Sequence, residues 1–387
     1  MSDIGAFTLL AIAVRAIGYA GSLLAMGSGI FLLACGTHAF PGTEPAAVNR
    51  VWRRTMRLGV LAALLAVAAT LAGLGVRAGR LSGMGISGVG DPMMLQIVWE
   101  GAVGTAVAMR IAGLAAVAAG LLLFRARPGK ALIAAGAVAV AFSHTFVGHA
   151  TEAPRAVLAG ALTLHLLAAA AWFGSFPPLI GAARGFARAD AVWLMQAFGR
   201  AALWGVGILV AAGATFAAIL IRTPEGLAQS AYGRILLAKL AVVAVLLGLA
   251  ALNRYRLVPA LAAGQAGARK RLVRSIRIEA AAVVLILAIT ATLTSVASPP
   301  PRPDPARDQA TPVAPTSAAP GSASLSMIGQ SGRWSPLQLA ARCLSAPAIA
   351  CNSLIFASSS ATCARATAFT SALARPRSCH SANSAVI

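Results

Sequence analysis

Residues 104–122 read GTAVAMRIAGLAAVAAGLL, and Arg110 is the only charged residue among them. An α-helix needs about 20 predominantly apolar residues to cross the hydrocarbon core of a bilayer, so this stretch predicts a membrane-spanning helix. Of the whole 387-residue chain, 58% of the residues are hydrophobic and 11% are charged, whereas soluble domains carry about 25% charged residues. Little of the protein surface can therefore face water, and we predict an all-α polytopic membrane protein.

Seven further apolar blocks of comparable length predict seven more helices. The eight predicted spans are residues 7–34, 58–76, 101–124, 131–148, 156–183, 192–221, 231–253 and 276–297. No basic region precedes the first block, which includes Arg15, so we expect a retained first helix and not a cleaved signal peptide. Together the spans define a predicted membrane domain over residues 1–298.

Lysines and arginines are concentrated in alternate connections between the predicted spans. The odd-numbered connections hold sixteen of them and the even-numbered connections five. Because basic residues favour cytoplasmic loops, we predict that the odd-numbered connections are cytoplasmic and that both termini are periplasmic. These loops account for much of the formal net charge of +22, and we expect no nucleic-acid partner.

Two pairs of segments indicate an internal repeat. The stretch at 104–122 resembles GRILLAKLAVVAVLLGLAA at 233–251, with Arg110 matched to Lys239, and AATLAG near Thr70 resembles GATFAA near Thr215. Since the matched segments are four spans apart, we predict two four-helix repeats with the same orientation in the membrane.

Residues 299–387 differ in character from the rest of the chain. They are rich in Pro, Ala and Ser and contain no Asp, Glu or Lys after Asp308, which predicts a disordered or frame-shifted tail. A metal-binding or disulfide-bonded tail is the alternative, although its cysteines lack the paired C-x-x-C spacing of zinc sites. These cysteines are Cys343, Cys351, Cys363 and Cys379.

Three histidines are the first candidate metal ligands, because imidazole binds copper, zinc and iron. His144 and His149 lie near the predicted periplasmic end of the fourth span, and His165 lies ten residues into the fifth helix, about 15 Å deep. An ionisable side chain inside a membrane commonly marks a site or an ion path. We predict a descending series of metal sites, with a packing role for His165 as the alternative.

Three methionines on the same predicted side are further candidates. Met84, Met93 and Met94 lie with Asp91 in the second connection, and thioether sulfur selects Cu(I). The alternative is that Met93 and Met94 merely begin the next helix.

Buried cations leave a second function open. Arg15, Arg110 and Lys239 either extend toward the headgroups or face the bundle interior. Arginines near histidines also suit the propionates of a haem with bis-histidine iron, so a haem-binding electron-transfer subunit is one alternative and a ligand-free structural subunit is another. We find no nucleophile–base pair, carboxylate dyad or ATP-binding loop and therefore predict that the protein is not an enzyme.

Residues 143–301 resemble the copper resistance protein D (CopD) family of bacterial inner-membrane proteins. The resemblance rests on LHLLAAAAWFGSFPPLI at 164–180, the Tyr-Gly-Arg start and Asn-Arg-Tyr-Arg end of the seventh span, and LVRSIRIEAAAVVLILAITATLTSVASPPP at 272–301. The first half resembles the family more loosely.

The resemblance implies that the protein handles copper, moving it from the periplasm toward the cytoplasm and contributing to copper homeostasis or resistance. It also implies a periplasmic CopC-like copper carrier as a partner. His165 and Trp172 belong to the motif of the family, and His144 and His149 to the histidine-bearing segment before it. Gly18 and Tyr19 stand where a histidine is expected in the first helix, so that helix lacks the corresponding ligand.

Overall fold

The computed structural model describes residues 2–151, 154–220 and 231–295. These residues form helices and no strands, and eight of the helices are long and apolar enough to cross a membrane, which confirms the predicted all-α polytopic fold class. The eight helices are α1 (Ser2–Cys35), α2 (Pro45–Leu81), α4 (Ala102–Leu122), α5 (Arg127–Ser143), α6 (Arg155–Gly185), α7 (Arg188–Leu220), α9 (Ala231–Leu252) and α11 (Ala268–Leu293).

Short helical elements fill several of the connections. They are η1 (Gly85–Gly88), α3 (Pro92–Glu100), η2 (His144–Phe146), η3 (Gly148–Thr151), the π-helical turn η4 (Asn253–Leu257) and α10 (Val258–Ala262). Helix α3 begins where it does because the Asp91 carboxylate accepts hydrogen bonds from the backbone N–H groups of Met93 and Met94, which satisfies donors that a helix start leaves free.

Two helix ends differ from the predicted spans. Helix α2 begins at Pro45, 13 residues before the apolar block at 58, because hydropathy marks only the part of a helix that suits lipid and the cationic first turns continue the same helix. Helix α5 ends at Ser143 and passes into the tight turn η2, and Gly148 follows with a φ of 77°. A backbone with this φ leaves the right-handed helix, and glycine adopts it without a steric penalty.

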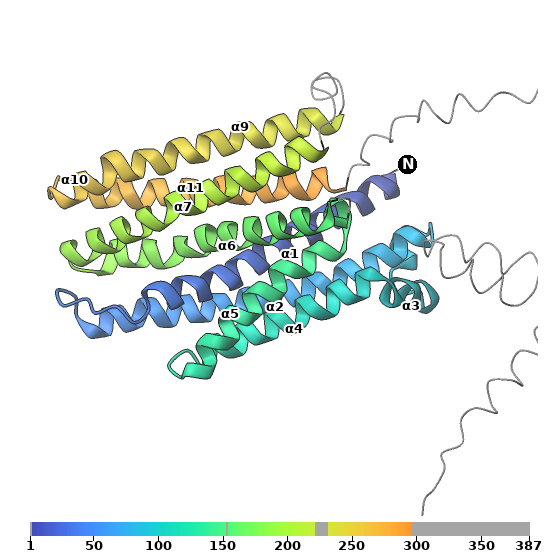
Figure 1. Cartoon of the computed structure of the whole chain (residues 1–387), viewed down its shortest axis with the longest axis horizontal. Coiled ribbons are helices and arrows are strands. Elements are labelled where there is room, and N and C mark those ends of the chain that lie inside the picture. Colours follow the sequence, from blue (N-terminus) through green and yellow to red (C-terminus); the bar gives the residue numbers. More distant parts are fainter. Residues whose placement is uncertain (1, 152–153, 221–230, 296–387) are drawn as a thin grey trace, which may run out of the picture. The chain divides into compact units, whose positions relative to one another are not determined.

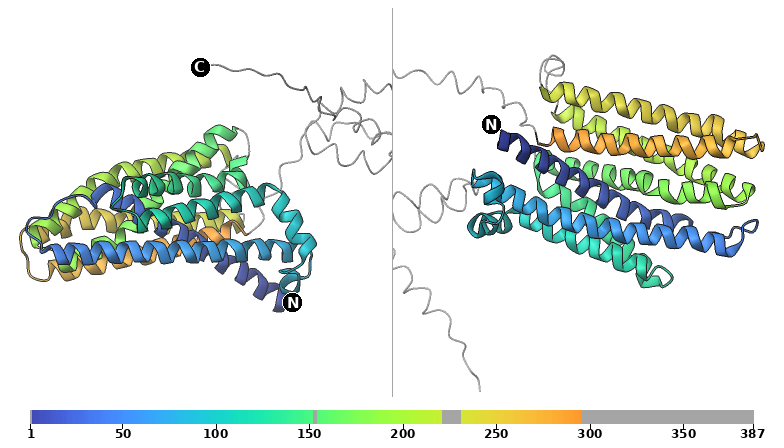
Figure 2. Two further views of the ribbon diagram at one scale, coloured as in Figure 1. Left: turned by 90° about the horizontal axis from the view of Figure 1, so that it is seen from below. Right: turned by 180° about the vertical axis from the view of Figure 1, so that it is seen from behind.

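Helices α1 and α6 occupy the centre of the bundle. Helix α1 packs against α2, α6 and α11, while α6 packs against α1, α7 and α11. Figure 1 shows α7, α9 and α11 on one side of this central pair and α2, α4 and α5 on the other, and the view from behind in Figure 2 agrees. Each side thus contributes half of the long helices around one central pair.

The backbones of α1 and α6 touch where two glycines meet. A Cβ atom added to Gly174 would lie 2.3 Å from the carbonyl carbon of Gly27, and one added to Gly27 would lie 1.8 Å from the carbonyl oxygen of Ala170. Small residues permit such close approach between helices in lipid, where association depends on packing and not on the hydrophobic effect. This crossing therefore holds the central pair together.

The odd-numbered connections lie together at one end of the bundle. The turns from α1 to α2, from α4 to α5 and from α6 to α7 lie at the same end as α10, whereas the N-terminus lies at the opposite end (Figure 1). Aromatic packing of Phe40 against Trp52 and Phe186, and the hydrogen bond from Thr43 to Asp190 (2.6 Å), tie this end together. The basic residues of these connections therefore share one face, as a single cytoplasmic surface requires.

Candidate functional site

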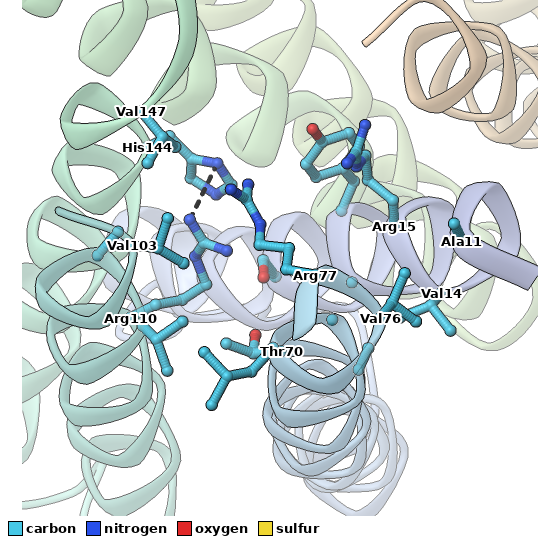
Figure 3. A pocket seen from close by; sticks show the side chains of 18 of the residues that line it. Ala11, Val14, Arg15, Thr70, Val76, Arg77, Val103, Arg110, His144 and Val147 are labelled. Carbon is cyan, nitrogen blue, oxygen red and sulfur yellow. Dashed lines mark hydrogen bonds between the residues drawn. The ribbon is translucent and has the colours of Figure 1, made fainter. Parts of the chain in front are cut away.

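His144 follows the last residue of α5, and its ring is held by an arginine. The Nη2 atom of Arg110 lies 3.3 Å from His144 Nδ1, and Arg110 Nε donates to Ser143 Oγ at 3.1 Å (Figure 3). Arginine only donates hydrogen bonds, so Nδ1 must accept and the proton of the neutral ring must be on Nε2. Copper could bind His144 in this arrangement only after Arg110 moved away or Nε2 lost its proton.

The methionines lie on the outside of short elements. Met84 precedes η1 with 54% of its surface exposed, and Met93 lies in the first turn of α3 with 68% exposed. Met94 is half-buried beside it. Both the helix-start role and the copper-ligand role therefore remain open for Met93 and Met94, because their backbones cap α3 while the Met93 side chain is free to reach an ion.

The remaining two histidines differ in how much is described. His149 belongs to η3, but its side chain lies outside the described part of the structure. His165 is half-buried on α6, donates a hydrogen bond to the backbone carbonyl of Leu209 in α7, and is close enough to Lys239 of α9 for their charges to interact. A metal-binding histidine commonly donates one ring N–H to a backbone carbonyl, which fixes the ring and leaves the other nitrogen for the metal.

A buried carboxyl group lies deeper in the same helix group. Glu279 of α11 is only 4% exposed and accepts hydrogen bonds from the side chains of Asn253 in η4 and Trp172 in α6. The Oδ1 atom of Asn253 and the hydroxyl of Ser275, one turn before Glu279, are buried and lack hydrogen-bond partners among the described residues. Unsatisfied buried polar atoms beside a carboxyl group are uncommon and indicate a site that accepts a further group.

His165 and Glu279 are linked through one face of α6. Trp172 follows His165 by seven residues, so the two side chains lie on the same face about 10 Å apart along the axis. Trp172 contacts Glu279 directly. The imidazole and the carboxyl group are therefore two separate polar positions at different depths.

Two family models match the chain in separate segments. The model described as copper resistance protein D-like, N-terminal domain, matches residues 1–156, and the model described as copper resistance protein D matches residues 192–293. The chain belongs to the copper resistance protein D family. It is therefore a multi-pass membrane protein related to copper resistance, and no curated protein and no solved structure matches it in the other two comparisons.

The matched segments place most of the CopD-family site residues. His144, His149 and the three methionines lie in the N-terminal match, whereas Glu279, Asn253 and Lys239 lie in the C-terminal match. Most of α6, with His165 and Trp172, lies between the two matches.

The CopD-family chain does not gather its candidate ligands into one cage. Among the residues that the structure describes, no three His, Cys, Asp or Glu side chains come together in a way that could hold a metal ion. The residues present fit single, separated contacts with a copper ion, and the predicted series of sites at different depths stays a prediction.

Sequence reasoning missed Glu279 and Asn253, although a signal for one of them was present. Glu279 is the only Asp or Glu within the eight predicted spans, and a carboxyl group in a membrane span is by itself an indication of function. No comparable signal identifies Asn253, because its importance comes from the π-helical turn that points its amide at Glu279. Such turns interrupt regular helices and are frequent at functional sites.

Proposed function

We propose that this CopD-family protein carries copper through the bacterial inner membrane from the periplasm toward the cytoplasm, as a carrier and not an enzyme. A periplasmic CopC-like protein is its proposed donor. The proposal rests on one observation above all: a buried Glu279, held by Trp172 and Asn253, lies below His165 on the same helix face.

His165 is the proposed ligand at membrane depth. Its hydrogen bond to Leu209 orients the ring and leaves one ring nitrogen available, in contrast to His144. The nearby Lys239 opposes a metal cation while it is charged. A lysine, unlike an arginine, can release its proton inside a protein, so copper binding at His165 is expected to accompany proton loss from Lys239.

Glu279 supplies the negative charge that a cation path through lipid requires. At an effective dielectric constant of about 20, unit charges about 8 Å apart interact by about 2 kcal/mol, which corresponds to roughly 30-fold in affinity. The oxygen ligands of this group suit hard cations better than Cu(I). We therefore assign Glu279 to charge compensation, as a carboxylate or proton acceptor, and not to lasting coordination of copper.

The substitution Glu279→Gln tests this function. In proteoliposomes loaded with a copper chelator, we expect it to lower the initial rate of copper uptake by about tenfold, because the amide keeps the shape but loses the charge. Copper in the recovered vesicles is measured by mass spectrometry. Glu100→Gln, which alters an exposed acid at the end of α3, is the matched control and should transport like the parent. Parental uptake by Glu279→Gln would remove Glu279 from the path.

The same preparation separates copper from haem. A bis-histidine haem gives an intense Soret absorption band, whereas a Cu(I) site is colourless in the visible range. We expect no Soret band and copper retained after reconstitution. A stoichiometric band would replace the copper proposal with the haem alternative, and absence of both copper binding and haem would favour a structural subunit.

Membrane orientation is tested by fusing a reporter that is active only in the periplasm. We expect activity when it follows Ser295 at the end of α11 and none when it follows Arg269 at the start of α11, because the basic connections favour the cytoplasm. Cell fractionation confirms that each fusion reaches the inner membrane. The reverse pattern would place His144 on the cytoplasmic side and invert the proposed direction.

A further inference from the structure

A cavity of about 120 Å³ lies between α1, α2 and α4, beside the turn η2. Four arginines line it, namely Arg15, Arg77, Arg80 and Arg110, together with Tyr19 and His144. Figure 3 shows Arg77 and Arg110 extending toward His144, with Arg15 across the space from them. This concentration of positive charge lies within the N-terminal half and does not include the His165–Glu279 region.

The charges of these arginines are not balanced by the protein. No Asp or Glu is among the described residues that line the cavity. Arg77 is close enough to Arg15, Arg80 and Arg110 for their charges to repel. Because arginine remains protonated in proteins, the repulsion persists unless an anion enters.

The arginines also differ in how their N–H groups are used. Arg15 Nη1 donates to the Thr294 carbonyl oxygen at 2.7 Å and to Ser295 Oγ at 3.0 Å, so it is anchored at the end of α11. Arg110 is anchored by Ser143 and His144. Arg77 is half-buried, yet no hydrogen bond joins its side chain to any residue that the structure describes. Anchored arginines around one with unused donors form a prearranged binding site.

We propose that this cavity binds a phosphate group, carried by the headgroup of a phospholipid or by free inorganic phosphate. Guanidinium groups present forked donors that match phosphate oxygens, and such charge-assisted hydrogen bonds are the strong ones. The cavity is comparable in size to an engineered cavity of about 150 Å³ that holds benzene, so a phosphate group fits. Bound phosphate also lowers the positive potential beside His144, which a copper ion would otherwise meet.

Inorganic phosphate provides the direct test on the full protein in detergent without copper. We expect phosphate to raise the melting temperature of the parent and to bind in a calorimetric titration. Arg77→Gln should weaken phosphate binding by about tenfold, since a hydrogen bond to a charged group contributes about 1.5–3 kcal/mol. It should also raise the melting temperature of the phosphate-free protein, because one repelling charge is removed. Arg53→Gln, which alters an exposed arginine in the first turns of the same helix, should change neither.

The source of the phosphate group is identified by native mass spectrometry of the same proteins. A phospholipid retained by the parent and by Arg53→Gln but lost from Arg77→Gln supports the headgroup, and calorimetric binding of inorganic phosphate without retained lipid supports the free ion. The proposal is overturned if the parent binds neither, or if Arg77→Gln binds either one as the parent does. If Arg77→Gln fails to fold, the titration of the parent still decides. Since copper is absent throughout, failure here leaves the transport proposal standing, and failure of transport leaves the phosphate site standing.

Discussion

We expect His165→Ala to reduce copper accumulation to the level of cells that lack the protein. The substitution removes the imidazole at membrane depth, and the neighbouring residues ALTLHLLAAAA offer no replacement ligand. It also frees the Leu209 carbonyl, but an intramolecular hydrogen bond contributes only about 1 kcal/mol, and Ala does not make the span less apolar. Insertion should therefore be retained while copper handling is lost.

Cellular copper is measured by mass spectrometry, with the amount of protein in the membrane as the reference. Leu164→Ala is the matched control, because Leu164 lies beside His165 on α6 but is 55% exposed on the outside of the helix. It should accumulate copper like the parent. His149→Ala should give an intermediate loss, since the sulfur atoms of Met93 and Met94 can still bind Cu(I) at the periplasmic side. Parental accumulation by His165→Ala would leave His165 as a packing residue and refute the descending path.

We expect Gly174→Leu to eliminate the folded protein. Its first side-chain atom would lie 2.3 Å from the carbonyl carbon of Gly27 and 2.5 Å from the backbone nitrogen of Ser28. Overpacking a core commonly costs about 1–3 kcal/mol when side chains can adjust. Here the obstructing atoms are backbone, so α1 and α6 must separate along the crossing and the expected loss exceeds about 3 kcal/mol.

The measurement is the yield of monodisperse protein after detergent extraction, followed by size-exclusion chromatography. Gly160→Leu provides the control on the same helix, because a Cβ atom at Gly160 meets nothing within 4 Å. It should be extracted and elute as the parent does. Equal yields from both variants would show that the α1–α6 contact does not hold the bundle together.

The candidate site was only partly predictable from residue types. His144 and His165 both stand out as imidazoles at apolar positions, yet their chemical states differ because Arg110 occupies a nitrogen of one and a backbone carbonyl orients the other. Arg77 was predicted to lie in a periplasmic connection, whereas α2 continues to Leu81 and carries Arg77 into the cavity. Each difference comes from a partner on another helix, and local composition carries no information about that partner.

The sequence by itself determined the eight helices and the end at which the basic connections gather. This follows because a chain in lipid must satisfy its backbone hydrogen bonds within each helix, so length and hydropathy are sufficient to identify the spans. Only the tertiary structure decided that Gly27 meets Gly174, that Glu279 meets Asn253 and Trp172, and that four arginines surround one cavity. Apolar side chains are nearly as favourable against lipid as against another helix, so shape and polar contacts between helices, and not hydropathy, select these partners.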